Sequence, residues 1–217
     1  MVGVPRIPKI LFIDWDKTLS NSRFWEYWEP AKRHLAAQAL FADAPDLVRD
    51  WMRGYLTAGQ AMEYTATVTG LPYDELMQEL QRSCERMRLI NEDDIRLIQA
   101  IRHRGVHVVV ATDNMDTFTQ WTIPSLGLDR YFDGFLVSAD EQALKSQIAH
   151  DGSSTFFRHF FTSTGVNPGA SVILDDSSNN RVLEERLGIR FRHVTPSVPL
   201  NRHLQQINED LMASVSD

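Results

Sequence analysis

The sequence has little cysteine and little lysine. Cys84 is the single cysteine among 217 residues, so an intramolecular disulfide and a cysteine-rich zinc site are both excluded. Only four lysines are present and the formal net charge is −7. This balance argues against a nucleic-acid-binding surface, because such surfaces need clustered basic side chains to neutralise phosphates. An anionic small substrate stays compatible with it where a metal ion supplies positive charge locally.

Long apolar runs are also missing. None approaches the roughly 20 residues that a membrane-spanning helix needs, and the N-terminal segment meets charge after too short an apolar run for a signal peptide. We therefore expect a soluble, cytoplasmic protein that binds no membrane. The composition, 43% hydrophobic and 24% charged, indicates one globular core with material for an inserted subdomain. The oligomeric state stays open.

Five short apolar runs, each bounded by turn or polar residues, predict β-strands. They start at residues 10, 106, 134, 171 and 190 and read ILFI, VHVVVA, GFLVS, SVIL and RFRHV. Helical patterns separate the later runs, as in the segment that has Asn91 as its N-cap and ends at Gly105. This alternation predicts an α/β fold, with a Rossmann-like parallel sheet flanked by helices.

The interval 21–90 holds helical patterns and no convincing strand. Thr57 and Gln60 have the spacing of a capping box. About seventy helical residues are far more than a crossover between parallel strands needs. We therefore predict an all-helical cap subdomain inserted over 21–90, with 1–20 and 91–217 forming the Rossmann-like core domain. The chain after Pro199 predicts one short helix and a fraying end.

Two carboxylates follow the first predicted strand directly. Side chains alternate along a strand, so Asp14 and Asp16 leave its end on one side and Trp15 on the other. At a separation of about 4 Å and an effective dielectric of about 20, two such charges repel by roughly 4 kcal/mol. A cation or a shared proton must relieve this repulsion.

Other predicted strands also end in polar groups. Thr112 stands at the tip of the second, Asp175 and Asp176 stand at the tip of the fourth, and Lys145 lies between them in sequence. In an open α/β sheet, ligands bind outside the carboxyl ends of the strands. These side chains are therefore candidates for one shared site.

In order, the strand ends offer Asp-x-Asp-x-Thr, Thr, Lys and Asp-Asp, and this order resembles the haloacid dehalogenase (HAD) superfamily. The segments DWDKTL at 14, VVVAT at 108, Lys145 and ILDDSSNN at 173 are similar to its four motifs, and the helical insertion stands where many members carry a cap. The resemblance spans nearly the whole chain. It implies a magnesium-dependent phosphatase that acts on a small phosphorylated metabolite.

The resemblance also implies a role for each motif residue. Asp14 would attack phosphorus to form an aspartyl-phosphate, and Asp16 would protonate the leaving oxygen and later take a proton from water. Thr112 and Lys145 would contact the phosphoryl group and offset its charge. Asn114, two residues after Thr112, is a further substrate-binding candidate.

The same resemblance implies Mg²⁺ as the cofactor, since this ion prefers oxygen ligands. Its candidate ligands are Asp14, Asp16 through the backbone carbonyl, Asp176 and Asp175. Alignment on the family's Gly-Asp pattern favours Asp176 over Asp175 for direct ligation. A solvated helical lysine is the alternative interpretation of Lys145, with a nearby arginine then supplying the charge, and Arg158 and Arg181 are the candidates for that.

Other functions compete with the phosphatase. A phosphomutase would keep every motif named above, and a non-catalytic HAD-fold interaction protein would keep the fold. A dehalogenase would use Asp14 but has no use for an acid at Asp16. A receiver domain places its acceptor aspartate after a later strand. The sequence does not identify the substrate.

The segment RFWEYWEP follows the first motif and opens the insertion. Phe24 and Trp28 lie four residues apart, which favours one buried helical face within the insertion. The alternative is a lid, in which Trp25 or Trp28 lines the cleft and excludes water when it closes.

Overall fold

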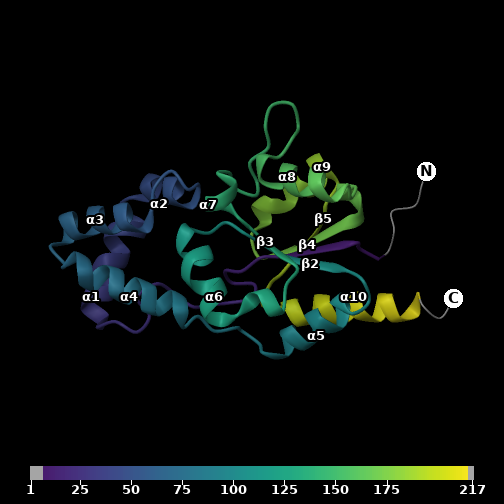
Figure 1. Ribbon diagram of the computed structural model, residues 1–217, viewed down its shortest axis with the longest axis horizontal. Coiled ribbons are helices and arrows are strands. Elements are labelled where there is room, and N and C mark those ends of the chain that lie inside the picture. The colour runs from purple at the N-terminus through teal and green to yellow at the C-terminus, as the bar shows by residue number, and fades with distance from the viewer. Residues whose placement is uncertain (1–6, 215–217) are drawn as a thin grey trace.

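A sheet of five parallel strands, in the order β3-β2-β1-β4-β5, forms the centre of the molecule (Figure 1). The computed structural model describes residues 7–214. The strands are β1 (Ile10–Ile13), β2 (His107–Thr112), β3 (Gly134–Val137), β4 (Ser171–Asp175) and β5 (Arg190–His193). Every run that predicts a strand forms one of these, so the predicted Rossmann-like parallel sheet is confirmed.

The helices divide into those flanking the sheet and those between β1 and β2. The first group comprises α5 (Asp93–Arg102), α6 (Ile123–Leu126), α7 (Ser138–Glu141), α8 (Thr155–Thr164), α9 (Val182–Leu187) and α10 (Leu200–Ala213). The second comprises α1 (Pro30–Ala37), the π-helical turn η1 (Gln38–Ala42), α2 (Pro45–Met52), α3 (Ala58–Thr69) and α4 (Tyr73–Glu85). Four further helical turns complete the set: η2 (Phe118–Thr122), η3 (Leu128–Arg130), η4 (Pro168–Ala170) and η5 (Ser178–Arg181).

Both faces of the sheet are buried because side chains alternate along each strand. Leu11 and Ile13 point into a core shared with α5 and α10, whereas Phe12 points to the opposite face and packs on α8. Phe12 makes edge contacts there with Phe157, at 5.1 Å between ring centroids. Figure 1 shows α8 and α9 on one side of the sheet and α5 and α10 on the other.

The C-terminal helix is longer than the sequence suggests. The prediction of one short helix after Pro199 is wrong, since α10 has 14 residues. Leu204, Ile207 and Leu211 are buried along it, and this apolar stripe covers the sheet beside α5.

Two predictions concern the ends of the chain and lie at least partly outside the described residues. The predicted fraying end falls largely on residues 215–217, and the prediction about a signal peptide falls partly on residues 1–6. Among the described helices, none is long and apolar enough to cross a membrane.

Residues 21–90, called the helical insertion below, lie beside the carboxyl ends of the strands (Figure 1). Two connecting segments, one at each end of the insertion, join it to the sheet. They are hydrogen-bonded to each other, since the Ile90 N–H donates to the Leu19 carbonyl over 2.8 Å. The predicted capping box at Thr57 is present. All regular elements described within the insertion are helices. That this unit is a separate cap subdomain stays a prediction.

A second contact ties the insertion to the segment after β2. The Trp51 Nε1–H donates to Asp116 Oδ1 over 2.7 Å, and the Ala58 N–H donates to Asp116 Oδ2 over 3.1 Å. Gly54 lies so close to the Ala139 carbonyl that a Cβ at this position would meet the oxygen at 2.1 Å. The insertion is therefore held at two places, and between them a cleft of about 1110 Å³ opens.

The lid interpretation of Trp25 and Trp28 is not supported by their positions. Trp25 is 0% exposed; its backbone N–H donates to Ser83 Oγ over 3.0 Å and its Nε1–H to the Leu76 carbonyl over 3.1 Å. Of the described aromatic residues, Phe24 and Phe41 line the cleft, and neither tryptophan does. Trp25 is a core residue of the helical insertion.

Replacing Trp25 by Ala should therefore lower the free energy of unfolding by about 3–5 kcal/mol, because a large buried side chain and the hydrogen bond of its indole N–H are lost. Trp28→Ala is the matched control. Because Trp28 is half-buried, its replacement should lower the free energy of unfolding by less. Urea denaturation measures both. A Trp25→Ala protein with the wild-type midpoint would contradict the assignment.

Candidate active site

Asp14 lies at the point where β1 leaves the sheet. Its N–H donates to the Leu174 carbonyl of β4 over 3.0 Å, so the backbone is fixed by the neighbouring strand. The residue is only 5% exposed. Because β1 and β4 run parallel, their ends meet at one edge of the sheet, and Asp175 at the end of β4 lies near Asp14.

Lys145 joins these two carboxylates. Its Nζ donates to Asp14 Oδ1 and to Asp175 Oδ2, each over 2.6 Å. The lysine is 2% exposed and comes from the connection between α7 and α8 rather than from a helix. Both carboxylates stabilise its charge and raise the pKa of Lys145 above its usual value, against the opposing effect of burial. The ammonium therefore stays protonated.

Neither alternative arginine reaches this position. Arg158 is exposed and bonds Ser153, and the Arg181 guanidinium lies over the Phe191 ring. The buried cation beside Asp14 is thus Lys145, although its catalytic role stays a prediction.

Asp113 holds the backbone of Lys145 and was not among the site residues predicted from sequence. Its Oδ1 accepts the Lys145 N–H over 2.8 Å. The only sequence signal was its place directly after Thr112 at the end of β2. Asp113 therefore positions Lys145 for its contacts with Asp14 and Asp175.

The two adjacent aspartates after β4 have different surroundings. Asp175 is 0% exposed, and both its oxygens accept protein hydrogen bonds, Oδ1 from the Ser177 N–H over 2.8 Å and Oδ2 from Lys145 and from Asn180 Nδ2 over 2.8 Å. Asp176 is half-buried, and no other described residue donates a hydrogen bond to its carboxylate. Asp176 is thus the freer of the two to bind a ligand.

The carboxylates of Asp14, Asp175 and Asp176 can hold a metal ion, since an oxygen of each lies within 4.8 Å of the others. Removal from water raises the pKa of Asp14 to about 8 although Lys145 opposes the shift, and Asp175 adds to it. Burial and Asp175 also raise the pKa of Asp176. Lys145 alone does not neutralise this cluster, so the residues fit a further cation with a preference for oxygen ligands.

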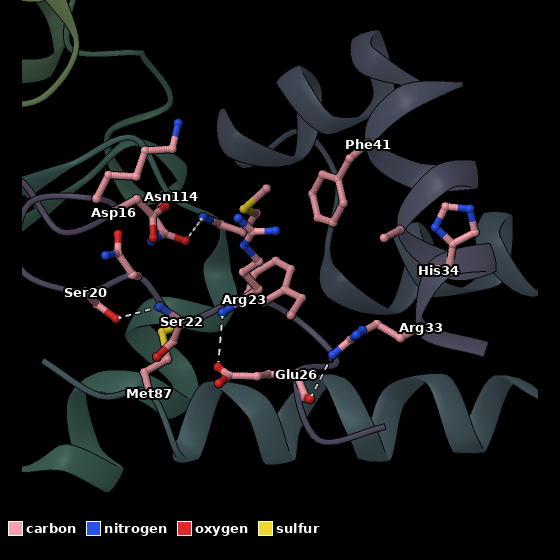
Figure 2. A pocket seen from close by; sticks show the side chains of 15 residues that line it. Asp16, Ser20, Ser22, Arg23, Glu26, Arg33, His34, Phe41, Met87 and Asn114 are labelled. Atoms are coloured by element: carbon pink, nitrogen blue, oxygen red, sulfur yellow. Dashed lines mark hydrogen bonds between the residues drawn. The ribbon is translucent and has the colours of Figure 1, made fainter. Parts of the chain in front are cut away.

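Asp16 opens onto the cleft. Solvent reaches its carboxyl group, although protein surrounds it on the remaining sides, and this partial loss of water raises its pKa to about 6 against the effect of Lys145. Figure 2 shows Asp16 and Asn114 at the same end of the cleft. Asp16 is therefore placed to meet a molecule bound in the cleft.

Thr112 and Asn114 follow β2 at this edge. The Thr112 Oγ1 is buried without a hydrogen-bond partner in the described structure. The Asn114 side chain accepts the Met115 N–H through Oδ1 over 2.9 Å, and its backbone N–H donates to Ser138 Oγ over 2.9 Å. Asn114 lines the cleft, whereas Thr112 does not.

The fold and the site define a class: an α/β protein whose parallel strands end in an acidic cluster bridged by one buried lysine. The family model of the haloacid dehalogenase-like hydrolases matches residues 11–158, and the chain belongs to this family. The resemblance read from the four motifs is thereby confirmed. The comparison with curated proteins found no match.

Solved structures share this fold at low sequence identity. A HAD family enzyme from Bacteroides thetaiotaomicron, solved with magnesium and inorganic phosphate, is 15% identical with a TM-score of 0.62 over 87% of this chain and 94% of its own. A predicted HAD-like hydrolase from Porphyromonas gingivalis is 16% identical with a TM-score of 0.62, over 87% and 91%. L-2-haloacid dehalogenase from Xanthobacter autotrophicus is 14% identical with a TM-score of 0.63, over 93% and 88%.

Proposed function

We propose that this hydrolase is a magnesium-dependent phosphatase that cleaves a small phosphorylated metabolite through an aspartyl-phosphate on Asp14. The proposal rests on one observation: the carboxylates of Asp14, Asp175 and Asp176 lie close together, and the single positive charge of Lys145 does not neutralise all three. A divalent metal ion would offset the negative charge that Lys145 leaves, and it would also attract a phosphate dianion to the cluster. The Bacteroides enzyme with bound magnesium and phosphate supports the same chemistry.

The proposed reaction has two steps. The Asp14 carboxylate forms a bond to phosphorus while the bond from phosphorus to the leaving oxygen breaks, and Asp16 gives that oxygen a proton. Asp16 then takes a proton from water as the water oxygen attacks phosphorus, and the bond to Asp14 breaks. The carboxylate and the acid are both restored.

The other residues hold and neutralise the reacting groups. Lys145 orients Asp14 and offsets charge that it shares with the phosphoryl group, and Asn114 can donate from its amide into the cleft. Asp14, Asp176 and the backbone carbonyl of Asp16 would hold magnesium, with Asp175 fixing Lys145 beside them. When bound, magnesium supplies positive charge for the phosphoryl oxygens.

The dehalogenase activity of the Xanthobacter neighbour is the main competitor. Displacement of a halide needs a carboxylate nucleophile but no proton donor for the leaving group. Asp16 on the cleft and the acidic cluster at Asp175 and Asp176 both favour phosphoryl transfer.

The expected result is hydrolysis of a generic aryl phosphate with Mg²⁺ and a loss of about 100-fold or more in excess chelator, since a metal supplies several kcal/mol of charge stabilisation. Inorganic phosphate release gives the rate, and 2-chloropropionate is the control substrate. Undiminished hydrolysis in chelator, or release of chloride in place of phosphate, would contradict the proposal.

A further inference from the structure

On the side of the helical insertion, the cleft is lined by two arginines, Arg23 and Arg33, and by His34. Figure 2 shows Asp16 and Asn114 at one end of the cleft, Arg33 and His34 toward the other, and Arg23 between them. We propose that the substrate's leaving group carries a second anionic group, a carboxylate or a further phosphate, which Arg23 and Arg33 bind. This inference rests on the proposed phosphatase function and names its substrate class.

The Arg23 guanidinium is available for such a ligand. Figure 2 shows its side chain extending from the insertion into the cleft, and the residue is exposed. Its backbone N–H donates to Glu26 Oε2 over 3.4 Å, but the guanidinium has no acceptor among residues 7–214. The planar guanidinium group of Arg23 therefore presents five N–H donors to the cleft.

Arg33 adds a second, partly used guanidinium. Its Nη1 donates to the Glu26 backbone carbonyl over 3.2 Å, which fixes the side chain and leaves further N–H groups without a carboxylate partner in the described chain. The Glu26 carboxylate is instead paired with Arg88 over 3.0 Å. Glu26, the acid of the insertion that lines the cleft, is therefore neutralised by Arg88, and the charges of Arg23 and Arg33 remain for a bound anion.

This positive end stands out in a chain whose net charge is −7. Guanidinium groups without a carboxylate partner bind a carboxylate or phosphate through charge-assisted hydrogen bonds, and low-dielectric walls strengthen the attraction. Phe24 and Phe41 supply such walls, with ring centroids 6.0 Å apart. An organic linker beside the rings would join the reacting phosphate near Asp16 to the anion at the arginines.

Three esters on one flexible scaffold test the inference: butyl phosphates that end in a carboxylate, a second phosphate or an uncharged carboxamide. Their leaving oxygens have nearly the same chemistry, so differences in kcat/KM report the remote group. With Mg²⁺, the wild-type protein should prefer at least one anionic ester over the carboxamide by about 10- to 100-fold. Which anion is preferred separates the carboxylate from the second phosphate.

The preference should disappear in Arg23→Gln and persist in part in Arg23→Lys, which keeps the charge without the planar guanidinium group. Arg49→Gln is the matched control, because Arg49 is exposed on α2, outside the cleft, and pairs with Asp46. It should keep the wild-type preference. Equal kcat/KM for all three esters in the wild type, or an unchanged preference in Arg23→Gln, would overturn the inference and leave the phosphatase proposal standing.

If the wild type hydrolyses none of the esters, the phosphatase proposal fails, and calorimetric binding of the same esters decides the inference. Tighter binding of an anionic ester than of the carboxamide, lost in Arg23→Gln, would support the anion site. Equal binding of all three would overturn it.

Discussion

Replacing Asp14 by Asn is expected to lower kcat for aryl phosphate hydrolysis by at least about 1000-fold, because a carboxamide is a poor nucleophile and the covalent route is lost. The side chains have nearly the same shape, and the amide oxygen can still accept from Lys145 Nζ. Phosphate release with saturating Mg²⁺ measures the effect, and circular dichroism checks the fold.

Asp129→Asn is the matched control for this charge change. Asp129 is exposed, lies in η3 and does not line the cleft, so its replacement should leave the rate at the wild-type value. An Asp14→Asn protein with a tenth of the wild-type rate would exclude Asp14 as the nucleophile.

Replacing Lys145 by Met should destabilise the protein by about 3–5 kcal/mol, because a buried ion pair loses its cation. The carboxylates of Asp14 and Asp175 would then face each other without a neutralising cation. Their side chains are only 7% and 0% exposed. Urea denaturation measures the loss. Added Mg²⁺ should restore part of the stability, since a cation that binds only the folded state stabilises it.

Lys32→Met provides the comparison for Lys145→Met. Lys32 pairs with Glu75 at the surface, with 38% and 44% exposed side chains, and such pairs contribute about 0–1 kcal/mol. Equal midpoint shifts for the two variants would mean that Lys145 does not hold the buried carboxylates together.

Much of the fold could be predicted from local patterns. Apolar runs such as that at Ile10 predict buried parallel strands, and parallel strands bring their carboxyl ends to one edge. The meeting of Asp14 and Asp175 follows from this rule and needs no knowledge of the tertiary contacts. Lys145 was harder to predict, since it lies in an irregular connection without a periodic signal.

The surroundings of the site could not be predicted from sequence, because contacts between distant segments determine them. Helical spacing does not tell which face of the insertion turns toward the sheet, and the contacts of Trp51 and Gly54 with the segments after β2 and β3 decide that orientation. Trp25 further adopts a positive φ of 56°, which periodicity does not reveal. The cleft is therefore lined by Phe24 rather than by the tryptophan beside it.

The covalent phosphoryl group on Asp14 tests the central claim most directly. An Asp16→Asn protein given an activated aryl phosphate and Mg²⁺ should complete the first step, which needs little acid assistance, and stall before the second, which needs a base. After acid quenching, mass spectrometry should find one phosphoryl group on the peptide that contains Asp14. Wild-type hydrolysis of the same ester, together with an Asp16→Asn protein that never carries phosphate on Asp14, would contradict the account.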